Sequence, residues 1–230
     1  MIAIILFGCA PWCSSEGSEP CTETPQPGDD ESHPLELPVQ AGDIIFIAVP
    51  NYLFRQVSLA TQCPSNHVGI VFHDPVKGWL VAESAVPLSR YTPLSKFIAR
   101  SKDGWCVLRR DRNGLNECQV TALRAQCDAR MGIFYNAGFG YESKGLFCSK
   151  FVHDVYLSAL GTEIGEMETF SHLLARNPRA GLTFWRAWFF GRIPWNRLTV
   201  TPASQFESPL LVTAWESCRG GCGNRLSKNK

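Results

Sequence analysis

The sequence predicts a domain of the α+β class, and two patterns support this prediction. Apolar residues recur at i, i+3, i+4, i+7 and i+8 from Val152 to Leu160, which is typical of an amphipathic helix. Two apolar runs, 67–72 and 79–83, flank a turn-rich segment and indicate an antiparallel hairpin. A helix and an antiparallel sheet within one chain define the α+β class.

The composition is sufficient for a buried hydrophobic core. Of 230 residues, 45% are hydrophobic and 19% are charged, as in an ordinary globular domain. Residues 1–38 are rich in Ser, Glu, Pro and Asp without periodicity, so we expect a disordered acidic segment there. We expect one folded domain over 39–214 and a flexible tail over 215–230.

Charge is distributed unevenly along the chain. Residues 1–38 carry seven acids and no Lys or Arg, which leaves 22 basic and 14 acidic residues in the remainder. The basic residues form no tract, so no nucleic-acid partner is predicted. The aromatic segment 182–195 carries Arg186 and Arg192, and contact with a membrane surface is open there. We favour a core helix and loop for it. The oligomeric state is not predicted.

The sequence leaves the compartment open. No run reaches the roughly 18 apolar residues of a membrane span. Met1 to Ala10 is apolar but short and lacks the positive start of a signal peptide. Leu6-Phe7-Gly8-Cys9 faintly resembles a bacterial lipid-attachment box. The incomplete export signal and ten cysteines favour the cytoplasm, with an envelope anchor through Cys9 as the alternative. The role of Cys218 and Cys222 is not predicted.

The remaining elements follow from local patterns. Ile44–Val49 is a β-branched apolar run and predicts a buried strand, and Asn51 opens a helix. Asn116 is a predicted helix cap, and Gly161 ends the helix after Cys148. The other predicted elements are helices over 94–100, 117–129 and 169–176, a strand over 105–109, and a last strand from 200–209 and 210–214.

The hairpin places a histidine and a glutamate on one face. With a loop over 73–77, Val71 pairs with Trp79 and His67 pairs with Glu83. Their Cβ atoms would then be about 5 Å apart. A two-residue slip would make them diagonal neighbours on the same face, whereas a one-residue slip would separate them.

Cys148, His67 and Glu83 have the residue types of a nucleophile, a base and a group that orients the base. Cys148 lies in the first turn of its helix, where the dipole and the unpaired N–H groups favour a thiolate. Its backbone N–H is a candidate oxyanion donor. The alternative for each residue alone is structural: a buried thiol, a core histidine and a hairpin charge.

The other histidines fit the chemistry less well. His153 is five residues after Cys148 and should point about 140° away on a helix, so we expect it to face solvent. His73 lies in the turn and should be exposed, and His172 and His33 have no partner pattern. Cys63 and His67 have C-x3-H spacing without a second ligand pair, so no metal site and no cofactor are predicted.

Four segments resemble the permuted papain-like hydrolases of the NlpC superfamily, especially the bacterial YebB/YiiX-type group. They are Gly42-Asp43-Ile44-Ile45-Phe46, Ser65-Asn66-His67-Val68-Gly69-Ile70, Val81-Ala82-Glu83-Ser84 and Phe147-Cys148-Ser149-Lys150-Phe151-Val152. The resemblance implies an antiparallel sheet or partial barrel packed against the cysteine helix. It also implies Cys148 as nucleophile, His67 as base and Glu83 as the orienting acid.

We therefore expect a cysteine hydrolase that forms an acyl-thioester, acting as an amidase or peptidase on a small peptide or a cell-wall-derived amide. A lipid-directed acyltransferase or thioesterase is the alternative, because the thiol chemistry would be the same. An inactive binding module is the alternative from another class.

Overall fold

The computed structural model describes residues 37–177 and 180–217. The expectations for residues 1–36, including Cys9 and His33, and for Cys218 and Cys222 lie outside these ranges. No helix within them is long and apolar enough to cross a membrane.

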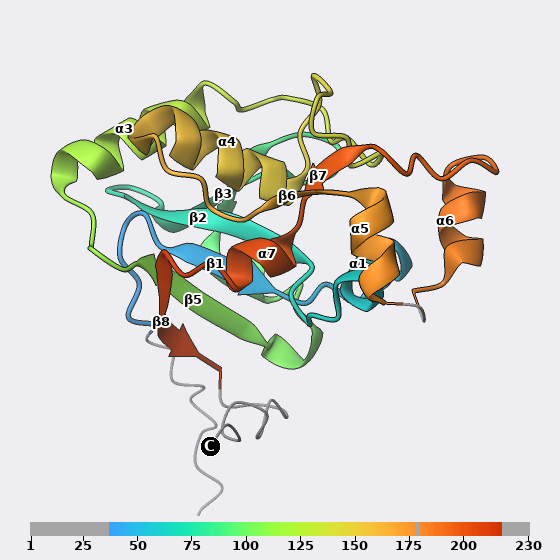
Figure 1. The fold of residues 1–230 in the computed structure, drawn as a ribbon. Helices are drawn as coiled ribbons and strands as arrows, with labels where there is room; N and C mark the ends of the chain where they lie inside the picture. Colours follow the sequence, from blue (N-terminus) through green and yellow to red (C-terminus); the bar gives the residue numbers. More distant parts are fainter. Residues whose placement is uncertain (1–36, 178–179, 218–230) are drawn as a thin grey trace, which may run out of the picture. The chain divides into compact units, whose positions relative to one another are not determined.

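The described residues form a six-stranded antiparallel sheet in the spatial order β4-β3-β2-β1-β5-β8 (Figure 1). A short two-stranded sheet pairs β6 with β7. The strands are β1 (Ile44–Ile47), β2 (His67–Asp74), β3 (Gly78–Glu83), β4 (Arg90–Pro93), β5 (Cys106–Asp111), β6 (Met167–Thr169), β7 (Leu198–Val200) and β8 (Leu211–Glu216).

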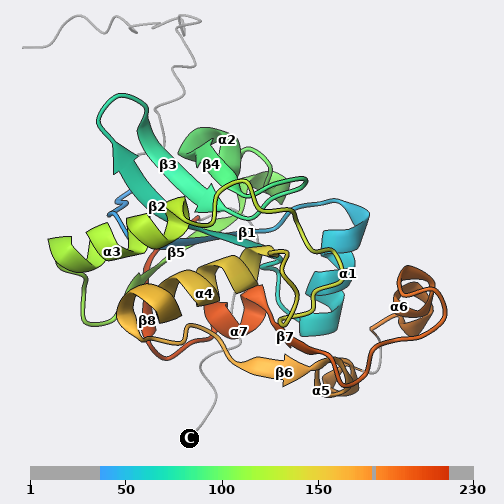
Figure 2. The ribbon, with the colours of Figure 1, turned by 90° about the horizontal axis from the view of Figure 1, so that it is seen from above.

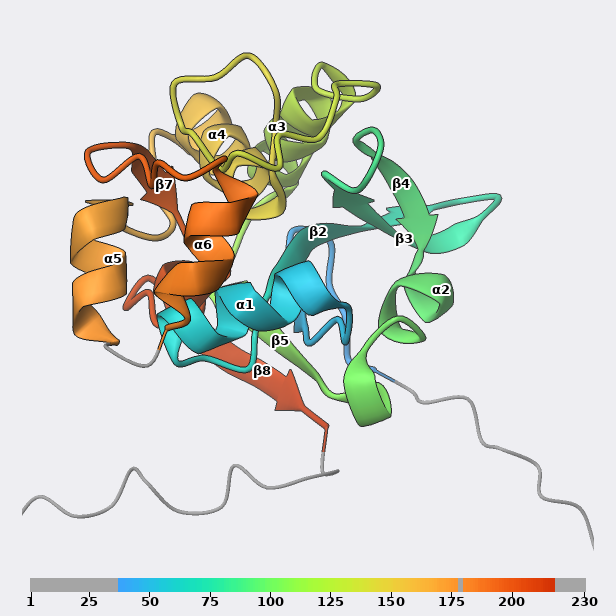
Figure 3. The ribbon, with the colours of Figure 1, turned by 90° about the vertical axis from the view of Figure 1, so that its right-hand side faces the viewer.

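Helices cover both faces of the large sheet and one of its ends. Helices α3 and α4 lie across one face (Figure 2), and α1, α5 and α6 gather beside the end of the sheet (Figure 3). The helices are α1 (Tyr52–Thr61), α2 (Leu94–Ile98), α3 (Glu117–Asp128), α4 (Cys148–Leu160), α5 (Phe170–Arg176), α6 (Leu182–Trp188) and α7 (Pro202–Phe206), with a 3-10 turn η1 (Lys102–Gly104).

The hydrophobic core lies on both faces of the large sheet, because successive side chains of a strand point to opposite faces. Ile44, Val68 and Ile70 pack with α3 and α4. Ile45 and Val71 belong to the opposite face and pack with α2. Both faces of β1 are buried, which explains its continuous apolar run.

Most predicted elements are present, and their ends follow the local signals. Asn51 caps α1 by accepting a hydrogen bond from the Phe54 N–H at 2.9 Å, and Asn116 forms a capping box with Gln119 at the start of α3. Helix α4 runs from Cys148 to Leu160 and ends at Gly161, whose φ is +65°.

Two predictions near the C-terminus were wrong. The segment expected to contribute a strand over 200–209 forms helix α7, because Thr201 caps it through the Ser204 N–H and Pro202 suits the first helical turn. Strand β8 also continues to Glu216, two residues into the expected tail.

The predicted hairpin register was wrong by two residues. Ile70 pairs with Ala82 and Asp74 with Gly78, so the strand extends beyond the expected turn. The reason is local: the Asp74 carboxylate accepts hydrogen bonds from the Val76 and Lys77 N–H groups and closes a shorter turn. Glu83 therefore lies across from Gly69, diagonal to His67 and on the same face.

Candidate active site

Three chain segments meet at one end of the large sheet. Strand β2 begins at His67 and its antiparallel neighbour β3 ends at Glu83, so the two residues lie at the same end. Helix α4 begins there with Cys148, which is 3% exposed. The structure thus brings together the three residues that the sequence analysis singled out.

The imidazole of His67 is fixed by one hydrogen bond and by two aromatic rings. Its Nε2 lies 2.6 Å from Glu83 Oε2. The Phe97 ring stacks against it at 5.4 Å between centroids, and the Phe54 ring meets it edge-on at 5.6 Å. The remaining nitrogen, Nδ1, is buried without a hydrogen-bond partner in the described chain. The ring is therefore fixed, with Nδ1 free for a reacting group.

Glu83 is completely buried, yet both of its oxygens have donors. The Thr92 hydroxyl donates to Oε1 at 2.6 Å. Arg100 Nη2 donates to Oε1 at 2.9 Å and to Oε2 at 2.8 Å. Arg100 also lies over the Phe97 ring at 4.8 Å, so the segment at α2 both stacks on the imidazole and neutralises the carboxylate.

The electrostatics of the pair favour a charged imidazole beside a charged carboxylate. Burial lowers the pKa of His67, but Cys148 and then Glu83 outweigh it and raise that pKa from 6.5 to about 9. Burial raises the pKa of Glu83, but His67 and Arg100 outweigh it and bring that pKa down from 4.5 to about 2. At neutral pH the pair therefore favours the protonated, imidazolium form of His67.

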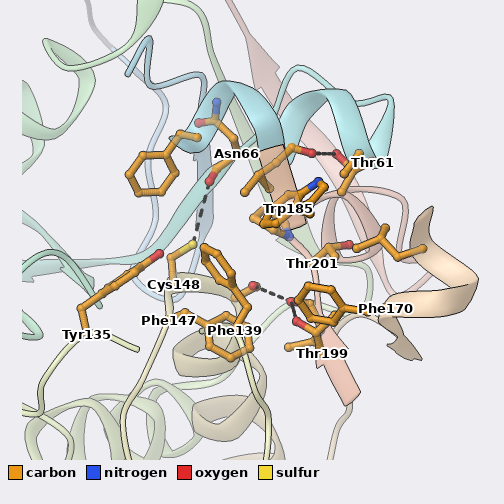
Figure 4. A pocket seen from close by; sticks show the side chains of 17 residues that line it. Thr61, Asn66, Tyr135, Phe139, Phe147, Cys148, Phe170, Trp185, Thr199 and Thr201 are labelled. Atoms are coloured by element: carbon orange, nitrogen blue, oxygen red, sulfur yellow. Dashed lines mark hydrogen bonds between the residues drawn. The ribbon is translucent and has the colours of Figure 1, made fainter. Parts of the chain in front are cut away.

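A tethered loop positions Cys148. The Ser84 hydroxyl, next to Glu83, donates to the Leu146 carbonyl at 3.1 Å, and the Asn136 N–H donates to the same carbonyl at 2.7 Å. Lys150 Nζ donates to the Ser143 carbonyl at 2.6 Å. The Cys148 sulfur lies 4.0 Å from the carbonyl oxygen of Asn66 (Figure 4), and Asn66 directly precedes His67 in the chain.

Tyr135 is a site residue that the sequence analysis missed. Its hydroxyl is buried without a hydrogen-bond partner in the described residues and is directed toward Cys148 (Figure 4). Burial raises the pKa of Tyr135 well above its ordinary value, the Cys148 thiol raises it further, and the Cys148 backbone N–H acts in the opposite direction. The only signal in the sequence was an aromatic residue in the approach to the cysteine.

Residues 38–214 match the model of a family described as permuted papain-like amidase enzymes, the YaeF/YiiX or C92 family. The chain belongs to this family.

Two YiiX proteins are similar to the chain. The uncharacterized protein YiiX of Escherichia coli (strain K12) is 29% identical over 174 residues, which cover 76% of this chain and 85% of that protein. A crystal structure described as metalloprotein yiiX from Escherichia coli O157:H7 is 30% identical. It matches with a TM-score of 0.72 over 77% of this chain and 97% of that chain.

Membership of the YaeF/YiiX family confirms the α+β, permuted papain-like fold and identifies the chain as an amidase-type cysteine hydrolase at the level of the family. Family membership also implies a small-molecule or peptide substrate. The histidine strand precedes the cysteine helix along the chain, in agreement with the permuted order.

The related E. coli structure is described as a metalloprotein, so the metal-binding capacity of the present donor groups matters. Among residues 37–177 and 180–217, no group of three or more His, Cys, Asp and Glu side chains is arranged to hold a metal ion. The Glu83 carboxylate already engages His67, Thr92 and Arg100. Within the described residues, the donor groups around Glu83 therefore do not fit a metal ion.

The other histidines lie away from the reacting groups. His153 was expected to face solvent, which was wrong: it is fully buried, and its Nδ1 lies 3.2 Å from the Ile164 carbonyl oxygen. The reason is the chain that covers this side of α4: the Tyr141 ring packs edge-on against the His153 ring and shields it from solvent. His73 is exposed as predicted, and His172 pairs with Glu168 at 3.4 Å.

Proposed function

We propose that the chain is a cysteine-dependent amidase or peptidase that acts through an acyl-thioester on Cys148, with a small peptide or a cell-wall-derived amide as substrate. The observation that carries the proposal is the orientation of His67. Its Nε2 is bound to Glu83 at 2.6 Å, while its Nδ1 has no hydrogen-bond partner among the described residues and the thiol of Cys148 raises the pKa of the ring.

In the first half of the reaction, the thiol proton passes to His67 Nδ1 and the sulfur attacks the amide carbonyl carbon. Negative charge then develops on the carbonyl oxygen. The Cys148 backbone N–H and the Tyr135 hydroxyl are the donors placed to stabilise it. As the C–N bond breaks, His67 gives its proton to the leaving nitrogen, and an amine departs.

In the second half, water attacks the thioester. His67 takes a proton from the water, the C–S bond breaks, and the proton returns to the sulfur as the carboxylic acid leaves. Glu83 does not transfer a proton. It fixes the ring through Nε2 and stabilises the imidazolium form.

The test combines labelling with turnover. Iodoacetamide is reacted with the protein from pH 8 to pH 5, and adducts are mapped by peptide mass spectrometry. Because Cys118 is exposed, it serves as the internal reference for an ordinary thiol. We expect Cys148 labelling to fall much less than Cys118 labelling toward pH 5, and His67→Ala to remove that difference.

Turnover is measured with 4-nitroanilides and 4-nitrophenyl esters, together with an intact-mass search for an acyl adduct. Cys148→Ala should lower turnover by about 10⁴-fold or more while the far-UV circular dichroism stays unchanged. Full activity of Cys148→Ala would disprove the proposal. A lipid-directed enzyme would accumulate a fatty acyl adduct on Cys148, and an inactive binding module would form no adduct.

A further inference from the structure

A narrow cavity opens beside the Cys148 sulfur, away from His67 and Glu83. The space open to the centre of a water molecule in it is about 30 Å³, so the cavity is small. Its walls come from α1, α5, α6 and the segments that flank the cysteine (Figure 4). Its apolar surface includes Val57, Ala60, Phe139, Phe170, Leu173 and Trp185.

Several polar side chains that line the cavity form hydrogen bonds with backbone groups of the protein. The Thr61 hydroxyl donates to the Val57 carbonyl at 3.0 Å, and the Ser149 hydroxyl donates to the Val200 carbonyl at 2.8 Å. The Asn66 side chain bonds to the Val49 backbone. Apart from Cys148 and Tyr135 at the reaction centre, the indole N–H of Trp185 is the buried wall donor without a partner in the described residues.

Charged groups are missing from the described wall as well. None of the residues that line the cavity is Asp, Glu, Lys or Arg. Residues 169–206 contain no acid at all, and neither do residues 44–73, which include α1. A charged group inside the cavity would lose its hydration and gain only neutral donors, such as the Trp185 indole N–H and the Thr201 hydroxyl, which is strongly unfavourable.

We propose that this cavity receives the acyl side of the substrate and selects an uncharged, apolar acyl group. The inference rests on the proposed function, because it assigns the cavity to the half of the substrate that becomes attached to Cys148. Its narrow volume favours a short aliphatic chain or the side chain of an apolar amino acid. Acyl groups that carry a carboxylate or an ammonium group are excluded.

The first experiment compares kcat/KM for 4-nitrophenyl esters of matched length. We expect the pentanoate to exceed the glutarate monoester, which replaces the terminal methyl by a carboxylate, by about 10²-fold or more. N-acetyl-leucine and palmitate esters distinguish the two sources of an apolar acyl group, a peptide and a lipid. Faster reaction of the N-acetyl-leucine ester than of the glutarate monoester supports the proposal and indicates a peptide source. A palmitate ester that reacts faster than the pentanoate would contradict the selection of a short acyl group and indicate a lipid source.

Substitutions in the cavity wall provide a second test. The same esters are compared in the variant and in the wild type, so differences in the intrinsic reactivity of the esters cancel. Ala60→Leu fills the cavity and should lower the ratio of pentanoate to acetate kcat/KM by about 10-fold. Leu173→Ala widens the cavity and should raise the ratio of hexanoate to acetate. Arg55→Leu places the same new side chain on the exposed side of α1, and it should leave the first ratio unchanged.

Two failures can be told apart. If esters acylate Cys148 but the glutarate monoester reacts as fast as the pentanoate, the selectivity proposal is overturned and the thiol mechanism stands. If no ester acylates Cys148 and Cys148→Ala matches the wild type, the proposed function fails and the assignment of the cavity fails with it. Unaltered ratios in both Ala60→Leu and Leu173→Ala, with folded proteins, would also overturn the proposal.

Discussion

Glu83 reaches His67 diagonally across Gly69, and the missing side chain of that glycine makes the approach possible. A Cβ on Gly69 would lie 2.4 Å from Val81 Cγ1, 2.8 Å from the Ala82 carbonyl oxygen and 3.4 Å from Glu83 Cβ. The first two distances are too short for any side chain. The acid and the imidazole therefore meet over a gap that only glycine leaves open.

Gly69→Ala should destabilise the protein by about 1–3 kcal/mol, because the new methyl group must displace a packed strand. It should also lower turnover, since the same strand carries Glu83. Chemical denaturation and kcat measure the two effects. Gly78→Ala is a useful contrast: Gly78 has open space around it but a φ of +71°, so it should lose stability without loss of kcat per folded molecule.

Tyr135→Phe should separate catalysis from stability. The hydroxyl has no partner in the described structure, so its removal should leave the free energy of unfolding unchanged or slightly higher. If the hydroxyl stabilises the oxyanion, kcat should fall by about 10–10³-fold with little change in KM. A variant with wild-type kcat would remove Tyr135 from the mechanism.

Glu83→Gln should lower kcat by about 10²–10⁴-fold, because an amide neither stabilises the imidazolium nor fixes the ring in the same tautomer. Loss of the charge that Arg100 neutralises should also lower stability. Glu168→Gln is a matched control, since Glu168 is likewise buried and pairs with Arg176 at 2.6 Å and with His172 at 3.4 Å. It should affect stability while kcat stays at the wild-type level.

Stability should depend on pH in two windows. His67 has its pKa raised from 6.5 to about 9, so its contribution is present in full below pH 6.5 and lost as pH rises through 9. Glu83 has its pKa lowered from 4.5 to about 2, so its contribution is present above pH 4.5 and lost as pH falls through 2.

Cys148→Ala tests the alkaline window. Because the thiol helps to raise the pKa of His67, the variant should lose the His67 contribution at a lower pH than the wild type. Denaturant unfolding from pH 5 to 10, with the imidazole titration followed by NMR, measures the difference. Identical alkaline profiles for both proteins would contradict this assignment.

Local patterns were sufficient for much of the fold. The cap residues Asn51 and Asn116 and the stop at Gly161 fixed helix ends because their hydrogen bonds and backbone angles involve only near neighbours. Parity along the strands kept His67 and Glu83 on one face although the register was wrong by two residues. The turn could not be set by composition alone, because the Asp74 side chain decided its length.

Other parts of the site depend on long-range packing and were out of reach. Nothing in the pattern around Arg100 indicates that it neutralises Glu83, since that contact requires α2 to pack on β3 and β4. The burial of His153 and the position of Tyr135 likewise depend on how the loop before α4 folds back. Such contacts join residues that are distant in the sequence, so local patterns do not predict them.

The site joins a local pair to a distant nucleophile. His67 and Glu83 are 16 positions apart within one hairpin, whereas Asn66 and Cys148 are 82 positions apart. Contacts between distant positions form slowly, since closing a long loop costs entropy before any contact repays it. A newly made chain should thus hold its imidazole and carboxylate together early and become reactive last.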